Sequence, residues 1–293
     1  MPRLALVTIL YKCDDVLEDF FKSISIQTFK EYKLYLIDNS ANEKTDRIIA
    51  DCKNKYPITD FTYINANGNV GVAAGNNIGI KKAIEEGCSS VLILNNDILI
   101  EQDFVFEKLM KLGEREMMIT PKILYYDDRK IWMAGGFMDY SRALGVHYGM
   151  KKTDDEEYNI PRYITYAPTC FLMVRAEVFN EIGLMDEKYF AYYDDTDFIL
   201  RAIRKGFKLW YEPSVFLLHK VSSSSGGDSS PFYIYYGNRN KIYFIRKNFS
   251  GIKKYFLLFY TLMSRIIFYL KFDTAGRKNL VKGIKDGFNI PVN

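Results

Sequence analysis

Short continuous apolar runs alternate with segments of helical spacing through the first hundred residues, and this alternation limits the fold more than any other feature. The runs have the length of strands that are buried on both faces. They cover residues 4–10, 32–37, 61–64 and 91–94. Between them, apolar side chains recur at helical spacing, for example at Leu17, Phe20 and Ile24. Strands that alternate with helices predict βαβ units and a mainly parallel sheet.

Right-handed crossovers bring the loops that follow these strands to one carboxyl edge of the sheet. The loops are residues 11–15, 38–42, 65–71 and 95–98. Because open α/β sheets bind their ligands at that edge, we expect the functional site there.

The alternation loosens after residue 100. Further strands are predicted at 117–123, 132–138, 169–174 and 208–211, and further helices at 177–182 and 195–205. A Ser/Gly-rich stretch at 222–230 predicts a flexible loop, and the chain after Pro231 has helical spacing. The predicted fold is therefore α/β, with a mixed, mainly parallel sheet flanked by helices and a C-terminal helical extension. The predicted domains are residues 1–230 and a tail of residues 231–293.

The tail is basic and aromatic, whereas the body is mildly acidic. Of the 40 basic and 36 acidic residues, 12 and two lie in 233–293, which gives that segment +10 and leaves −6 for residues 1–232. The apolar stretch 255–270 contains Arg265 and is shorter than the ~20 apolar residues of a spanning helix. It predicts an amphipathic helix on an anionic membrane surface. The alternative is that the tail packs on the body or forms a homo-oligomer interface; no nucleic-acid partner is expected.

The cysteines and the start of the chain indicate the compartment. The four cysteines are widely spaced and form no C-x-x-C pair, which is typical of a reducing cytosol. The chain enters its first predicted strand within four residues, without a signal peptide. We therefore expect a cytoplasmic protein, at the inner face of the plasma membrane if the tail binds lipid.

Asp97 follows the predicted strand 91–94 in the run Leu94-Asn95-Asn96-Asp97. A carboxylate at this edge can hold a divalent cation on a diphosphate, while water and phosphate supply the other ligands. The alternative is a simple turn, since Asn and Asp favour turns.

Asp194, Asp195 and Asp197 form a dense acidic cluster before a predicted helix. A positioned carboxylate can accept the proton of an attacking hydroxyl, and crowding raises the pKa of one member of such a cluster. The alternative is a helix N-terminus whose acids complement the dipole. One of the three can do this, but three acids beside Tyr192 and Tyr193 favour a functional role.

Two further features suit the same edge. The segment 67–79 holds four glycines and four asparagines at a helix start, where the backbone can approach an anionic ligand. It lacks both G-x-G-x-x-G and G-K-[ST], so neither a dinucleotide site nor a P-loop is indicated, and it can also be a tight helix start. His219 follows the apolar run 215–218 and is either a metal ligand beside Asp97 or a structural histidine.

In this order and spacing, these features resemble the family-2 inverting glycosyltransferases of GT-A fold, especially their bacterial rhamnosyltransferase-like branch. The resemblance covers about residues 4–225. The matching pieces are 7–11, 37–40, 67–79, 94–97, 190–198 with Arg201, and His219 followed by the serines at 222–225. The implied fold is a GT-A-type, Rossmann-like sheet.

The resemblance also implies which residues bind the donor. Thr8, Tyr11 and Asp38 would border the nucleotide base and ribose. The other implied donor-binding residues are Asn69, Gly71, Asn76, Asn96 and Asp97.

The same resemblance implies roles for the acids. Asp97 would be the metal-binding acid of a D-x-D-like motif, joined by His219, although Asn95 replaces the first Asp of many relatives. Asp195, the second member of the acidic pair, would be the catalytic base. The implied acceptor-side residues are Tyr192, Tyr193 and Asp194.

The function that we expect is inverting transfer of a sugar from a nucleotide-diphosphate donor, dTDP- or UDP-linked, with Mg²⁺ or Mn²⁺ as the divalent cation. Rhamnose is one candidate sugar. The acceptor would be a glycan or a lipid-linked glycan in bacterial surface polysaccharide synthesis. The alternatives are a sugar-phosphate nucleotidyltransferase and a non-catalytic, membrane-associated nucleotide-sugar-binding protein.

Overall fold

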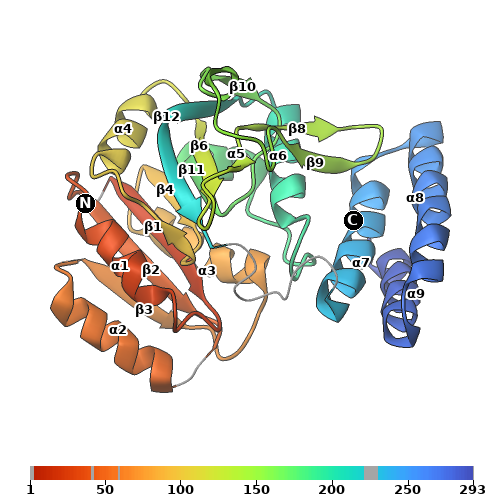
Figure 1. Cartoon of the computed structure of the whole chain (residues 1–293), viewed down its shortest axis with the longest axis horizontal. Helices are drawn as coiled ribbons and strands as arrows, with labels where there is room; N and C mark the ends of the chain where they lie inside the picture. Colours follow the sequence, from red (N-terminus) through yellow and green to blue (C-terminus); the bar gives the residue numbers. More distant parts are fainter. Residues whose placement is uncertain (1–2, 41–42, 59, 221–229, 293) are drawn as a thin grey trace.

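The computed structural model describes residues 3–40, 43–58, 60–220 and 230–292. The chain forms a central sheet with helices on both faces, followed by a group of C-terminal helices beside it (Figure 1). The first four strands are β1 (Leu4–Leu10), β2 (Tyr32–Asp38), β3 (Phe61–Asn65) and β4 (Ser90–Leu94). All pairs among them are parallel, in the order β3-β2-β1-β4, which confirms the βαβ prediction.

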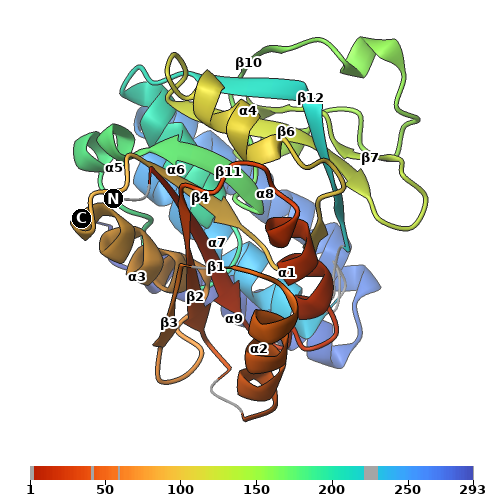
Figure 2. The same cartoon turned by 90° about the vertical axis from the view of Figure 1, so that its left-hand side faces the viewer.

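The helices between these strands cover the two faces of the sheet. They are α1 (Leu17–Ser25), α2 (Glu43–Lys55) and α3 (Val72–Glu85). Figure 2 shows α1 and α2 on one face and α3 on the other. Glycine allows α3 to approach β1 closely, because a Cβ at Gly79 would lie 2.5 Å from the Val7 side chain.

The second half of the chain widens the sheet with strands of both directions. These strands are β5 (Ile98–Leu99), β6 (Met118–Tyr125), β7 (Ile131–Met133), β10 (Arg162–Ile164), β11 (Phe171–Arg175) and β12 (Leu209–His219). In the described part of the chain, ten strands form one sheet of order β10-β12-β6-β11-β4-β1-β2-β3, with β5 on β12 and β7 on β6. A separate hairpin joins β8 (Gly136–Asp139) to β9 (Leu144–His147).

Three boundaries differ from the sequence prediction. The strand predicted at 208–211 runs on to His219, because its parallel pairing with β6 resumes after an irregularity between Glu212 and Phe216, where Pro213 lacks an N–H donor. The strand predicted at 132–138 is divided into β7 and β8, and Gly135 takes a left-handed φ of 84° between them. The predicted flexible loop 222–230 lies outside the described residues except for Ser230, whose Oγ accepts from Tyr233 N at the start of a helix.

The remaining helices are α4 (Val105–Leu112), a 3₁₀ turn (Glu156–Tyr158), α5 (Ala176–Ile182), α6 (Asp194–Arg204), α7 (Pro231–Asn248), α8 (Gly251–Lys271) and α9 (Thr274–Asn289). Among the C-terminal three, α7 and α9 pack closely, since a Cβ at Gly283 would lie 2.5 Å from the Tyr235 carbonyl oxygen. In Figure 1, α8 stands at the outer edge of the molecule. No helix in the described ranges is long and apolar enough to span a bilayer.

Candidate active site

Asp97 and His219 meet at the carboxyl edge of the sheet. Asp97 follows β4, and His219 is the last residue of β12, which pairs with β5 so that His219 lies opposite Ile98. The backbone N–H of Lys220 donates to the Asp97 carbonyl at 2.8 Å. The His219 Nε2 lies 3.1 Å from Asp97 Oδ1, and both side chains are nearly buried.

His219 Nε2 and Asp97 Oδ1 are the two atoms that could share a metal ion. They lie 3.1 Å apart, so an ion could take the place of the proton between them. His219 Nδ1, the other ring nitrogen, is buried without a partner among the described residues and faces away from Asp97. No group of three or more His, Cys, Asp or Glu residues that could hold a metal occurs in the described ranges. The chain thus offers two ligands, which is the number expected where a substrate phosphate completes the shell.

The acidic loop enters α6 through two strained residues. Tyr192 and Tyr193 have φ of 66° and 68°, a left-handed conformation that side-chain-bearing residues rarely adopt. The Asn240 amide on α7 donates to the carbonyl oxygens of Ala191 at 2.7 Å and Tyr192 at 3.0 Å. Strain of this kind persists only where the surroundings hold it, and it concentrates at functional sites.

The glycine-rich segment packs against the same loop. Val72 N donates to the Phe190 carbonyl at 2.7 Å, and a Cβ at Gly71 would lie 2.5 Å from that oxygen. Gly71 also has a φ of 88°. The glycine at this position therefore permits the contact between the two segments.

The three acids of the cluster have different surroundings. Asp197 is fully buried and holds a structural network. Its partners are Arg201, Lys247, Asn248 and Tyr189. Asp195 is half-buried; its Oδ2 accepts from Tyr166 Oη at 2.9 Å, and its Oδ1 accepts from the N–H and hydroxyl of Thr196. Asp195 is thus the positioned and accessible carboxylate.

Burial raises the pKa of both Asp194 and Asp195. Hydrogen bonds from Tyr166 and Thr196 partly offset this rise at Asp195. Asp194 lacks these bonds, and the neighbouring charge of Asp195 adds to its rise. The pair therefore holds one proton more readily at Asp194 than at Asp195.

The two acidic motifs converge on Cys170. Burial raises the pKa of this thiol, and the charges of Asp97 and then Asp195 raise it further, so both carboxylates lie within electrostatic reach of it. The backbone also joins them, since Asn95 N donates to the Cys170 carbonyl at 2.9 Å.

Aromatic rings also join the two motifs. The Tyr166 ring stacks on His147 with centroids 5.8 Å apart, and Trp132 lies 4.3 Å from His147 and 4.7 Å from His219. These contacts link Asp195 to Asp97 through side chains.

The residues that the resemblance implies for the base and ribose lie in, or directly after, β1 and β2. Asp38 is buried and accepts from Tyr63 Oη at 2.6 Å and from Ser40 N at 2.7 Å. Thr8 Oγ1 is buried without a partner in the described part of the chain. Tyr11 is half-buried at the following turn.

Two of the asparagines that the resemblance implies for donor binding form hydrogen bonds with backbone groups. Asn69 Oδ1 accepts from Gly71 N at 3.0 Å, and Asn96 Nδ2 donates to the Ile9 carbonyl at 2.7 Å. Asn76 is buried on α3, and its amide lies 3.9 Å from Met185 Sδ.

Sequence reasoning missed Tyr166, Asn240 and the rings of Trp132 and His147. Tyr166 lies between strands without a recognisable motif, so nothing local marks it. Asn240 carried a weak signal, because an amide within the apolar part of a helix needs a partner.

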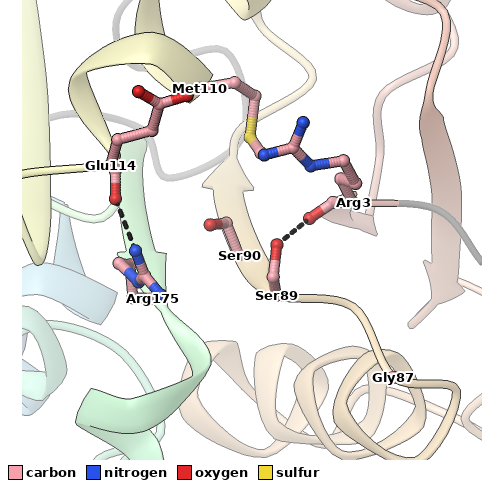
Figure 3. A pocket seen from close by; sticks show the side chains of 8 residues that line it. Arg3, Gly87, Ser89, Ser90, Met110, Glu114 and Arg175 are labelled. Atoms are coloured by element: carbon pink, nitrogen blue, oxygen red, sulfur yellow. Dashed lines mark hydrogen bonds between the residues drawn. The ribbon is translucent and has the colours of Figure 1, made fainter.

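A hollow of about 230 Å³ lies at the opposite edge of the sheet, where β1 and β4 begin (Figure 3). Arg175 lines it, but its guanidinium already donates to the Gly113 carbonyl at 2.7 Å and pairs with Glu177. Ser89 donates to the Arg3 carbonyl at 2.8 Å. These polar groups are occupied, and the hollow lies away from both acidic motifs.

Comparison with known proteins agrees with this geometry. The family model described as "Glycosyl transferase family 2" matches residues 5–183. A low-salt glycan biosynthesis hexosyltransferase, Agl10 of Haloferax volcanii, is 24% identical over 273 residues, covering 91% of this chain and 82% of its own. The dTDP-rhamnosyl transferase RfbF of Shigella flexneri is 27% identical over 246 residues, covering 76% of this chain and 74% of its own.

Solved structures share the fold at low identity. GalNAc-T7, crystallised with UDP, GalNAc and Mn²⁺, superposes with a TM-score of 0.66 and 16% identity over 87% of this chain and 50% of its own. At this identity the likeness concerns the arrangement of the sheet and helices, which confirms the predicted sheet architecture.

Proposed function

This chain belongs to glycosyl transferase family 2 and is a glycosyltransferase, and we propose that it transfers a hexosyl group from a nucleotide-diphosphate donor with inversion at the anomeric carbon. The observation that carries the proposal is that hydrogen bonds and ring contacts connect Asp195 to the Asp97–His219 pair through Tyr166, His147 and Trp132. One motif can accept the proton of a hydroxyl, and the other can face a diphosphate.

Asp195 is the proposed catalytic base. It accepts the proton of an acceptor hydroxyl, whose oxygen bonds to the anomeric carbon as the bond to the diphosphate breaks. Hydrogen bonds from Tyr166 and Thr196 hold the carboxylate, and its raised pKa makes it a stronger base than an exposed aspartate.

Asp97 and His219 are the proposed residues for a divalent cation, Mg²⁺ or Mn²⁺. The short distance of 3.1 Å between His219 Nε2 and Asp97 Oδ1 supports this, because one ion could bind both atoms in place of their shared proton. When bound, the cation offsets negative charge on the leaving diphosphate. Thr8, Tyr11 and Asp38 are proposed to border the base and ribose, and Asn69, Gly71, Asn76 and Asn96 to shape the donor site.

The donor is proposed to be dTDP- or UDP-linked, with rhamnose as one candidate. The RfbF relative, named a dTDP-rhamnosyl transferase, supports the first, and the UDP complex of GalNAc-T7 supports the second. The acceptor is proposed to be a glycan or lipid-linked glycan in surface polysaccharide synthesis, bound beside Tyr192, Tyr193 and Asp194.

The deciding experiment measures transfer and donor hydrolysis over a panel of nucleotide sugars, with and without Mn²⁺, for the wild type and Asp195→Asn. We expect kcat to fall by about 10²- to 10⁴-fold, while the affinity for the donor stays near that of the wild type. Asp128→Asn, an exposed acid, is the matched control. Near wild-type transfer by Asp195→Asn would show that Asp195 is not the base.

Two other functions predict different products. A nucleotidyltransferase would release pyrophosphate from a nucleoside triphosphate and a sugar 1-phosphate, and a binding protein would leave every donor intact. Membership of the family argues against both.

The tail is proposed as a membrane-binding unit of residues 231–293. One face of α8 carries an apolar stripe with exposed fractions from 44% at Met263 to 88% at Ile252. The stripe consists of Ile252, Tyr255, Phe256, Phe259, Met263, Ile266, Ile267 and Leu270. Arg265 does not interrupt it, because its guanidinium turns inward to Asn238 on α7.

An anionic bilayer is the proposed occupant of this stripe. Lys253, Lys254 and Lys271 lie at the two ends of α8, and the helix has no acidic residue. Two copies meeting through this face would bring like charges together, whereas anionic lipid would attract them. The enzyme is thus proposed to work at the cytoplasmic face of the plasma membrane.

A further inference from the structure

Lys241 on α7 is a buried cation without a counter-ion. It is 5% exposed, and its ammonium makes no hydrogen bond or ion pair with any described residue. Lysine is rarely buried to this extent unless it is paired, because removing the charge from water is unfavourable. The buried, unpaired ammonium of Lys241 therefore suggests a role in binding an anion.

Two further cations from other elements lie near it. Arg265 of α8 donates to Asn238, which lies one turn before Lys241 on α7. The β8–β9 turn that carries Arg142 packs on the same helices, since Ala143 belongs to one buried apolar cluster with Phe244 and Leu257. Burial lowers the pKa of Lys241 to about 8, and repulsion by Arg265 and Arg142 adds to this. Asp139 is the one acid that acts in the other direction. Both arginines therefore act on Lys241, which is still mostly protonated at neutral pH.

The charges of the three cations and Asp139 do not cancel. Arg142 Nε binds Asp139 at 2.6 Å. Arg265 donates to two neutral oxygens, Asn238 Oδ1 and Ser264 Oγ, and to no carboxylate among the described residues. Three cations and one carboxylate leave a local charge of about +2.

The group adjoins the acidic loop. The Tyr193 phenol interacts electrostatically with Arg265, and Tyr193 directly precedes Asp194. Asn240, next to Lys241, holds the carbonyl oxygens of Ala191 and Tyr192. The cations therefore lie on the tail side of the proposed acceptor site.

We propose that Arg142, Lys241 and Arg265, the tail cation cluster, bind a phosphate or diphosphate group. Arg142 and Arg265 present planar forks that match phosphate oxygens, and Lys241 supplies a point charge at the base of the site. The site is separate from the donor site at Asp97 and His219. That the phosphate belongs to the acceptor rests on the proposed function; anion binding itself does not.

The first test titrates inorganic pyrophosphate into the full-length protein in EDTA, which removes divalent cations from the donor site. Isothermal calorimetry compares the wild type with Lys241→Met, and with Lys285→Met as an exposed control on α9. We expect Lys241→Met to weaken binding by about tenfold or more, and Lys285→Met to leave it unchanged. Equal affinity in Lys241→Met and the wild type would overturn the proposal.

A second measurement, of Tm, distinguishes a loss of anion binding from a loss of folding. Because the folded-state pKa of Lys241 lies below that of the unfolded chain, its charge opposes folding below about pH 8, and this effect fades toward about pH 10.5. Lys241→Met should therefore raise Tm at pH 7, while pyrophosphate raises Tm only in the wild type. A lower Tm with pyrophosphate stabilisation retained would assign Lys241 a structural role alone.

The source of the phosphate is tested with vesicles. Phosphatidylcholine vesicles with and without farnesyl diphosphate compete with pyrophosphate for the wild type. Competition only by the diphosphate-bearing vesicles identifies a lipid-linked group, and competition by neither identifies a free anion. None of these measurements requires sugar transfer, so failure of the proposed function would leave them interpretable.

Discussion

Asp194 and Asp195 are neighbours in the sequence, yet their surroundings assign them different tasks. Asp195 is half-buried and accepts hydrogen bonds from Tyr166 and Thr196. Asp194 is 4% exposed, and burial is the main cause that raises its pKa. A carboxyl in this position is best tolerated when protonated.

Replacing Asp194 with Asn should therefore stabilise the fold. A folded-state pKa above the unfolded value means that ionisation opposes folding once the pH exceeds about 4. We expect Asp194→Asn to raise the free energy of unfolding by about 2 kcal/mol near pH 7.5, with little change near pH 4. Urea denaturation at both pH values checks this. A loss of stability at pH 7.5 would mean that favourable contacts hold Asp194 ionised.

The pKa of Asp195 should depend on Tyr166. The groups that face this carboxyl are Asp194, Tyr166, Cys170, Tyr193 and Thr196. The phenol of Tyr166 lowers the pKa of Asp195 by hydrogen-bonding to its charged form.

We expect Tyr166→Phe to move the acidic limb of the pH profile of kcat/KM to higher pH, because the base then keeps its proton longer. The matched control is Tyr163→Phe, which removes an exposed phenol bonded to Glu116. Unchanged acidic limbs in both variants would show that the Tyr166 bond does not tune the base.

At the scale of elements, α7 supports the acidic loop before α6. The Asn240 side chain is fully buried, and it binds the carbonyl oxygens of Ala191 and Tyr192, the start of the left-handed pair. Rings of α7 also pack on this pair, with Tyr233 5.0 Å from Tyr192 and Phe244 5.3 Å from Tyr193, but the Asn240 amide binds the strained backbone itself.

Asn240→Ala should therefore impair catalysis more than donor binding. Loss of two buried hydrogen bonds should lower the free energy of unfolding by about 1 to 3 kcal/mol and reduce kcat more than KM for the donor. Activity assays and urea denaturation measure these two effects. The control is Asn279→Ala, whose amide donates only to the Ala275 carbonyl within α9 among the described residues. A rise in donor KM alone would place the support of Asn240 on the donor side.

The elements that the sequence could predict are those with local patterns. The sequence predicts β1, β2 and β4 from their apolar runs and α1 from its helical spacing, because each pattern depends only on residues within that element. The full length of β12 depends on pairing with β6, far away in the sequence, and an irregularity at Pro213 hides it. For the same reason, Asp97 and His219 could be named as candidates, but their contact through β5 and β12 could not.

The sequence also could not predict the role of each acid in the cluster. Asp197 looks like Asp195 in the sequence, and only the packing of α7 against α6 shows that Lys247 and Asn248 occupy it. In the sequence, Lys241 resembles the other lysines of the tail, and only the structure shows that it is buried.

At the scale of the whole molecule, the tail and the body are joined by specific polar contacts. Lys247 of α7 bridges Asp186 and Asp197 at 2.7 and 2.9 Å, and Arg239 donates to the Lys188 carbonyl at 3.0 Å. Deleting the tail would therefore disturb the acidic loop as well as any surface that the tail binds. Point substitutions on the outer face of α8 are the sharper way to test membrane binding.

The apolar stripe of α8 should bind anionic vesicles and should lose that binding when it is charged. We expect the wild type to sediment with vesicles containing phosphatidylglycerol and much less with pure phosphatidylcholine, because the lysines at the ends of α8 attract anionic lipid. Binding should fall as NaCl rises from about 0.05 to 0.5 M, through screening. Phe259→Glu with Ile266→Glu should weaken it by more than about tenfold, whereas Val281→Glu on α9 should not.

Light scattering in the absence of vesicles tests whether the apolar stripe of α8 binds lipid or a second copy of the chain. If the stripe buries itself between two copies, the wild type would be a dimer and the double Glu variant a monomer, with no dependence on lipid charge. A wild type that stays monomeric without lipid, and a double variant that keeps donor hydrolysis but leaves the vesicles, would place the stripe on the bilayer. The stripe lies on the outer face of α8 and Arg265 on its inner face, so lipid contact by the first would bring the headgroup layer toward the tail cation cluster.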